Sequence, residues 1–234
     1  MSFEKKEAYF TKDSYAFLIQ SFFKRGYRFG MFDELDYFLN GIVYLRHDID
    51  FSVEWAYEMA LCDYNLGIRS TFFFLPNSEL YNLYSQQSIR RMADIHNMGH
   101  DICLHMDKGS YENLQNVLRC FIYYYPYARS NVIALHQPND FSSKPKLPIG
   151  CLDVYGEQFF NNIEYASDSG GEWKYGYPLQ RQAYRDKRSF QLLIHPIWWL
   201  STADDQGKIA HELVENIRLN ALQTLQQFKF MQPM

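Results

Sequence analysis

The sequence predicts an α/β fold, a distorted and incomplete (β/α) barrel of six or seven parallel strands in a single domain spanning residues 1–234. Short apolar segments of strand length alternate with longer segments of helical periodicity, a pattern typical of parallel strands joined by helical crossovers. A chain of 234 residues is ordinary for one barrel, and 47% hydrophobic residues suffice for a large core. The sequence contains no repeat and no linker rich in Gly and Ser, so we expect one domain.

Six segments have the pattern of strands. Residues 42–45 form an uninterrupted apolar run, as expected of a strand that is buried on both faces. Residues 71–75 contain three consecutive phenylalanines, and Pro76 ends this second segment. The remaining segments, of which the last two give weaker signals, are residues 101–104, 131–135, 163–166 and 190–194.

Helical segments lie between these strands. Apolar residues recur every three or four positions from Val53 to Tyr64, and Gly67 is a typical C-cap. A second helix is predicted around residues 89–98, and a third carries its apolar face over residues 111–125. A long helix near the C-terminus completes the alternation.

Chemically active side chains follow five of the six strands. The C-terminal strand ends of a barrel open into one mouth, where active sites are built. A single Asp or His in such a loop has ordinary explanations, including helix capping, but joint placement after five strands predicts a site. The residues are Arg46, His47, Asp48 and Asp50 after the first strand, then His105, His136, Asp168 and His195.

Asp48 and Asp50 form a carboxylate pair. Alternate residues of an extended segment face the same side, so both carboxylates project together while His47 and Ile49 project away. Two like charges this close need a cation or a shared proton. One carboxylate on a metal ion and the other free as a general base would meet that need. Alternatively, Asp50 or Ser52 only caps the following helix.

His105 and His136 are the expected partners of that carboxylate on the ion. Two imidazoles and one carboxylate suit zinc or a similar divalent ion such as cobalt, nickel or manganese, with one position left open. Such an ion acidifies water and polarises a carbonyl group. His100 precedes its strand, so we expect it at the opposite end of the barrel.

His195 is the expected proton donor to a leaving amine, and Asp168 would hold its imidazole protonated and oriented. A role for His195 as a third metal ligand is the alternative. Trp173, Trp198 and Trp199 lie close by in the sequence, where their rings would stack on a sugar or pack under a loop.

Composition excludes other classes of function. A formal net charge of −4 gives no basic footprint, so we expect no nucleic-acid partner. No apolar run is long enough for a signal peptide or a membrane span, and the four scattered cysteines suit a reducing compartment. The sequence therefore predicts a cytoplasmic protein.

Three short motifs, in this order, resemble the polysaccharide deacetylase superfamily (NodB-homology, carbohydrate esterase family 4-like), in a branch found with lipopolysaccharide O-antigen biosynthesis proteins. They are His47-Asp48-Ile49-Asp50, Gly99-His100-Asp101-Ile102-Cys103-Leu104-His105 and Leu193-Ile194-His195-Pro196, and the similarity spans residues 40 to 200. The resemblance implies a distorted, TIM-barrel-like fold with fewer than eight strands. It also implies a carbohydrate substrate.

The resemblance assigns roles to individual residues. It implies that Asp48 is the general base, that Asp50 and His105 bind the metal, and that His195 is the acid with Asp168 as its partner. The second motif of the family has a further histidine ligand where this chain has Gly109. The third motif of the family offers an arginine that steadies the base, whereas this chain has His136.

One substitution would compensate for the other if His136 completes the metal shell and Arg46 steadies Asp48. The predicted reaction is then metal-assisted hydrolysis of an amide, most simply the N-acetyl group of a nucleotide-linked or lipid-linked sugar. Two other classes stay open. Asp48-Ile49-Asp50 is also the DxD pattern of glycosyltransferases, and Gly109 is compatible with a non-catalytic sugar-binding relative.

Overall fold

The computed structural model describes residues 10–34, 40–137, 147, 150–156, 159, 163–203, 205–226 and 228. The chain divides into two compact units, Met1–Leu200 and Ser201–Met234. The described part of the second unit includes the long helix α10 (Gln206–Gln226). None of the helices in the described ranges combines the length and the apolar character that crossing a bilayer requires. The prediction of one domain over residues 1–234 stays a prediction.

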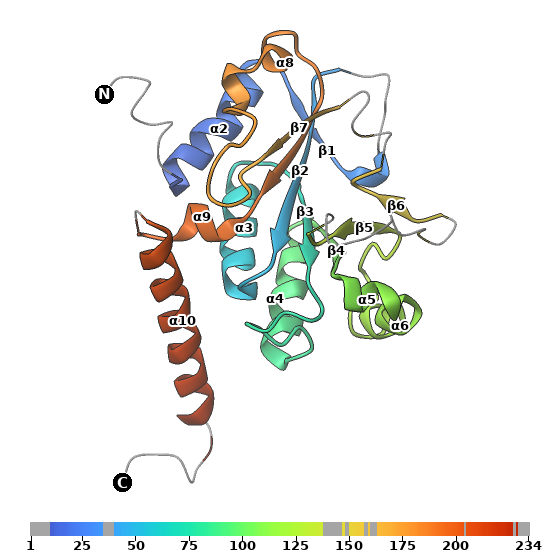
Figure 1. Cartoon of the computed structure of the whole chain (residues 1–234), viewed down its shortest axis with the longest axis vertical. Coiled ribbons are helices and arrows are strands. Elements are labelled where there is room, and N and C mark those ends of the chain that lie inside the picture. Colours follow the sequence, from blue (N-terminus) through green and yellow to red (C-terminus); the bar gives the residue numbers. More distant parts are fainter. Residues whose placement is uncertain are drawn as a thin grey trace. The chain divides into compact units, whose positions relative to one another are not determined.

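A parallel sheet curled into an incomplete barrel forms the centre of the first unit (Figure 1). The strands are β1 (Arg28–Gly30), β2 (Ile42–Ile49), β3 (Thr71–Phe74), β4 (Asp101–Met106), β5 (Val132–Leu135), β6 (Leu152–Asp153), β7 (Glu164–Ser167) and β8 (Phe190–Ile194). Neighbours follow the order β6-β5-β4-β3-β2-β8-β7. The strands therefore go round the sheet in chain order, with the opening between β6 and β7. This confirms the predicted fold class.

The strand count differs from the prediction because two short strands carry too little pattern to be predicted. Seven strands lie on the path round the sheet, and β1 pairs with β2 beside that path, which makes eight. β8 pairs with Val43 to His47 of β2, so β1 and β3 share the other edge of β2. β1 and β6 have only three and two residues.

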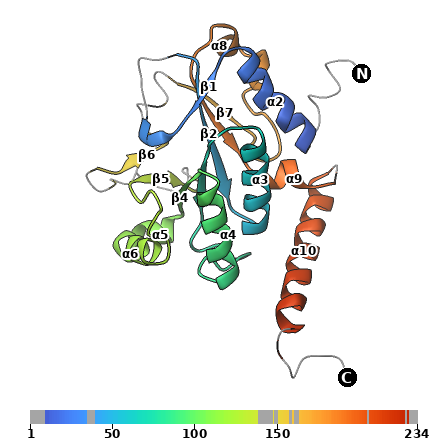
Figure 2. The same cartoon turned by 180° about the vertical axis from the view of Figure 1, so that it is seen from behind.

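Helices cover the outer face of the sheet, and α3 and α4 lie side by side in Figure 2. The α-helices in the described part of the first unit are α2 (Lys12–Lys24), α3 (Val53–Asn65), α4 (Gln86–Asn97), α5 (Lys108–Glu112), α6 (Leu114–Tyr124), α8 (Gln182–Arg185) and α9 (Pro196–Leu200). The single helix predicted over residues 111–125 is in fact α5 and α6, which meet at Asn113. The Ser52 side chain caps α3 by accepting a hydrogen bond from the Trp55 amide.

The two faces of β2 have different neighbours. Val43 and Leu45 belong to the apolar cluster that the helices contribute to, with Leu18 of α2 and Met59 of α3. The alternate residues face the barrel interior, where Tyr44 packs in a second apolar cluster, with Phe73, Cys103 and Ala134 from the next three strands. Apolar side chains therefore fill the lower part of the barrel. The same inward-facing rows become polar toward the C-terminal strand ends.

Candidate active site

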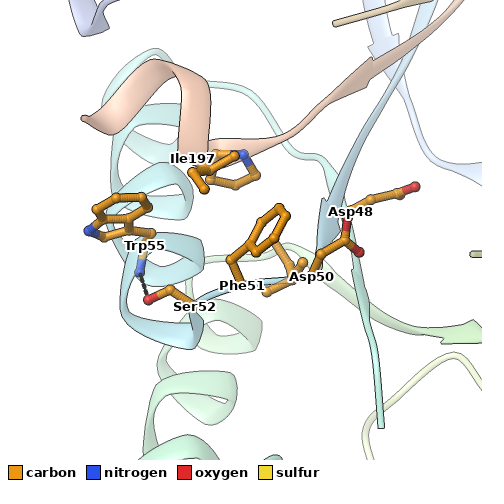
Figure 3. Close-up of a pocket in the computed structure, with 8 residues that line it drawn as sticks. Asp48, Asp50, Phe51, Ser52, Trp55 and Ile197 are labelled. Atoms are coloured by element: carbon orange, nitrogen blue, oxygen red, sulfur yellow. Dashed lines mark hydrogen bonds between the residues drawn. The ribbon is translucent and has the colours of Figure 1, made fainter. Parts of the chain in front are cut away.

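Asp48 and Asp50 project to the same side of the chain, as the alternation predicts. In Figure 3 their carboxylates extend away from Phe51, Trp55 and Ile197, which gather on the other side of the backbone and line a small pocket together with both aspartates. Both carboxylates are largely buried. Arg46 pairs with Asp48, whereas Asp50 faces imidazole nitrogens.

Arg46 pairs with Asp48 from two residues earlier on β2. Its Nε donates to Asp48 Oδ1 at 3.1 Å and its Nη2 donates to Asp48 Oδ2 at 2.6 Å. Burial would raise the pKa of Asp48, but the charge and hydrogen bonds of Arg46, together with the neighbouring His105 and His195, lower the pKa below its ordinary value. Asp48 is therefore ionised and rigidly held, as a general base at neutral pH must be.

Asp50, His105 and His136 lie around a common centre. One ligand atom from each lies within 4.8 Å of the other two. His105 Nε2 is 3.3 Å and His136 Nε2 is 3.9 Å from Asp50 Oδ1. Asp50 Oδ1 is buried and has no aligned hydrogen-bond donor among the residues that the structure describes. A buried carboxylate oxygen without a donor, facing two imidazoles, fits a divalent cation.

The backbone fixes the tautomer of His105. Its Nδ1 lies 3.2 Å from the carbonyl oxygen of Ala134, which can only accept, so Nδ1 carries the proton. Nε2 is then free to ligate an ion, in the arrangement in which a second contact orients a metal-binding histidine. Burial would lower the pKa of His105, but the neighbouring carboxylates of Asp48 and Asp50 raise it above its ordinary value.

His195 and Asp168 form the second half of the site. His195 Nδ1 donates to Asp168 Oδ1 at 2.6 Å, and its Nε2 lies 4.0 Å from Asp50 Oδ2. Burial would lower the pKa of His195, but the Asp168 carboxylate, helped by Asp48 and Asp50, raises the pKa to about 9. The imidazole therefore keeps its proton at neutral pH and directs Nε2 toward Asp50.

The three tryptophans do not share one environment. Trp199 is 2% exposed, and its indole N–H donates to Asp168 Oδ2 at 2.6 Å. Trp199 therefore holds the Asp168 carboxylate and offers no exposed ring face on which a sugar could stack. Trp173 packs at 6.2 Å, centroid to centroid, against Trp199. Trp198 is partly exposed, and its indole nitrogen has no partner in the described part of the chain.

Tyr155 belongs to the site, although no sequence pattern singles it out. Its hydroxyl accepts a hydrogen bond from Arg46 Nη2 at 2.8 Å, and its ring centroid lies 4.5 Å from the Arg46 Cζ. It follows the two-residue strand β6, so no periodic signal placed it at the mouth. Gly109 lies in α5 and offers no ligand.

Several solved structures similar to this chain are carbohydrate deacetylases. One is the chitin deacetylase of the fungal pathogen Colletotrichum lindemuthianum, with 13% identity, 77% of this chain and 83% of that chain covered, and a TM-score of 0.43. Another is a variant of a peptidoglycan deacetylase from Bacillus subtilis, with 12% identity, 82% and 96% coverage, and a TM-score of 0.36. A third is the catalytic domain of a peptidoglycan N-acetylglucosamine deacetylase from Eubacterium rectale, with 14% identity, 78% and 86% coverage, and a TM-score of 0.34.

Comparison of the sequence itself gave no match to a family model and none to a curated protein.

Proposed function

We propose that this protein is a metal-dependent carbohydrate N-deacetylase that removes the acetyl group from a nucleotide-linked or lipid-linked sugar during surface polysaccharide or O-antigen biosynthesis. The proposal includes a cytoplasmic location, which suits the four free cysteines. One observation carries it: a buried carboxylate oxygen of Asp50, without a hydrogen-bond donor among the described residues, faces the imidazoles of His105 and His136. The arginine-bound Asp48 and the protonated His195 lie beside it.

Each residue has a separate task in this proposal. Asp50, His105 and His136 would hold the ion, which when bound polarises an acyl carbonyl and acidifies water. Asp48 accepts the proton of the attacking water, and Arg46 keeps that carboxylate ionised and oriented. His195 gives its proton to the departing amine.

The test is release of acetate from a panel of N-acetylated sugar nucleotides, with zinc, cobalt or nickel supplied. We expect turnover by the natural chain and a loss of about 10²–10⁴-fold in Asp48→Asn and in His195→Ala, because each removes one proton-transfer group. His211→Ala is the matched control, since His211 is exposed on α10. Equal acetate release by Asp48→Asn and the natural chain would reject the proposed base.

A non-catalytic sugar-binding protein is the second candidate, and Gly109 at the position of a family ligand favours it. Metal analysis of the natural chain and of His136→Ala separates the two. The deacetylase proposal expects metal content to fall in His136→Ala, because no other described side chain completes the set. A natural chain that binds no stoichiometric ion would support the second candidate, and undiminished metal content in His136→Ala would reject His136 as a ligand.

A further inference from the structure

A second hollow lies next to the proposed active site, at the opening between β6 and β7. It has a volume of about 660 Å³, which is within the range of small-molecule pockets, roughly 300–1,000 Å³. Tyr155 after β6 and residues of β7 line it. The hollow therefore lies where the barrel is not closed by strand pairing.

Three tyrosines lead through this hollow from the buried site to the surface. Tyr155, which contacts Arg46, lies 6.2 Å from Tyr165, and Tyr165 lies 6.4 Å from Tyr175, centroid to centroid. Tyr155 and Tyr165 are partly buried, whereas Tyr175 is 63% exposed. The row of rings therefore connects the partner of the proposed base to an aromatic face open to solvent.

The described lining also carries three cationic side chains and one carboxylate. Glu164 pairs with Arg181, and its Oε2 lies 3.4 Å from Nη1 of Arg188. Arg181 also donates a hydrogen bond to the carbonyl oxygen of Tyr165. Lys174 is exposed and has no carboxylate within 4.0 Å among the residues that the structure describes. Positive charge in this hollow exceeds negative charge, although the chain as a whole has a net charge of −4.

We propose that this hollow, between Lys174, Arg188 and the tyrosine row, binds the diphosphate group of an activated sugar. Lysine and arginine side chains are the usual donors to phosphate oxygens, and Tyr175 offers a face on which a nucleobase stacks. A carbohydrate polymer carries no phosphate and would leave Lys174 without an anionic partner, and Arg188 with Glu164 alone. The orientation of the ligand rests on the proposed function: its sugar would point toward Asp48 and its diphosphate toward the hollow. Tyr155 joins the two places, because it lines the hollow and contacts Arg46, the partner of Asp48.

A nucleoside diphosphate and a lipid diphosphate share this chemistry, so the test uses three probes. Inorganic pyrophosphate, uridine diphosphate and geranyl diphosphate are titrated into the full chain by calorimetry, with EDTA present so that no metal ion can hold the phosphates. We expect binding, and a loss of about tenfold or more in Lys174→Ala and in Arg188→Ala, because each removes a charge-assisted hydrogen bond. Lys24→Ala, the same change at an exposed lysine of α2, leaves the affinity unchanged.

Tyr175→Ala identifies the source of the diphosphate. If uridine diphosphate loses affinity and pyrophosphate does not, a nucleoside occupies the aromatic face. If geranyl diphosphate binds more tightly than uridine diphosphate, the ligand is a lipid diphosphate. No binding of any probe up to 1 mM, or equal binding by Lys174→Ala, Arg188→Ala and the natural chain, would overturn the inference. Turnover is not measured, so failure of the deacetylase proposal would not produce either result.

Discussion

Asp168 is a fully buried carboxylate whose donors all come from the segment around β8 and α9. The His195 amide donates to both of its oxygens at 3.1 and 3.0 Å, and the imidazole and the Trp199 indole each donate at 2.6 Å. A buried charge needs such donors to remain ionised. Trp199 therefore acts on His195 through Asp168, as a positioning residue.

Replacing Trp199 by Phe keeps an aromatic ring and removes one donor. We expect kcat to fall roughly tenfold with KM unchanged, since a hydrogen bond to a charged group contributes about 1.5–3 kcal/mol. In an Asp168→Asn background the same substitution should cost little more, because both changes affect one unit. Steady-state kinetics of the four proteins measures this coupling. Trp198→Phe is the control, and additive losses would show that Trp199 only fills space.

The raised pKa of His195 sets the pH range of activity. Because the pKa of His195 is about 9, the imidazole stays protonated below that pH and loses its proton above it. The rate should therefore hold through neutral pH and fall as the pH rises toward about 9, with the charge of a bound cation moving the fall to lower pH. Asp168→Asn removes the partner charge, and burial then lowers the pKa of His195. With rising pH, the activity of this variant should therefore begin to decline at a lower pH than that of the natural chain. A pH–rate profile that is identical in both proteins would contradict this assignment.

At the scale of elements, β2 serves the site with one face and the core with the other. His47 points away from Asp48, and its Nε2 lies 2.9 Å from Asp63 Oδ2 on α3. Asp63 also accepts hydrogen bonds from Tyr15 of α2 and, at 2.6 Å, from Ser70 before β3. All of these groups are buried. The network ties three elements to the strand that carries the proposed base.

Asp63→Ala should destabilise the fold by about 3–5 kcal/mol, because it leaves the polar partners of a buried carboxylate unsatisfied. Equilibrium unfolding in urea measures the change. Glu58→Ala on the same helix is the control, since Glu58 forms only an exposed pair with Lys12 at 3.4 Å and should cost less than about 1 kcal/mol. Similar losses in both variants would show that the buried network adds no stability.

Sequence patterns predicted the elements that carry strong periodicity and missed those that do not. The six predicted strands correspond to β2, β3, β4, β5, β7 and β8. Their C-terminal ends bring Asp48, Asp50, His105, His136 and His195 together, because parallel strands in chain order place these ends at one mouth. β1 and β6 are too short for a pattern, and Tyr155 follows β6, so neither the strands nor this site residue could be predicted.

At the scale of the whole molecule, the site links strands that are distant in the chain. Asp50 follows β2, His105 lies on β4, and His136 follows β5. An ion held by all three residues binds only the folded first unit, so binding adds to the free energy of unfolding.

Zinc at a hundred times its Kd should therefore raise the free energy of unfolding by about 2.7 kcal/mol. Asp50→Ala and His105→Ala should lose this increase, whereas His211→Ala should retain it. Urea unfolding with and without zinc measures the difference. An increase of the same size in Asp50→Ala would place the stabilising ion elsewhere.

The central claim is that the ends of distant strands form one cation site beside an ionised base. Anomalous diffraction at the zinc edge, from crystals grown with zinc, tests it most directly. We expect one peak in the barrel mouth, roughly 2.0–2.2 Å from an oxygen of Asp50 and from the Nε2 atoms of His105 and His136. A zinc peak held by other residues, or no peak in the mouth at full zinc occupancy of the protein in solution, would contradict the account.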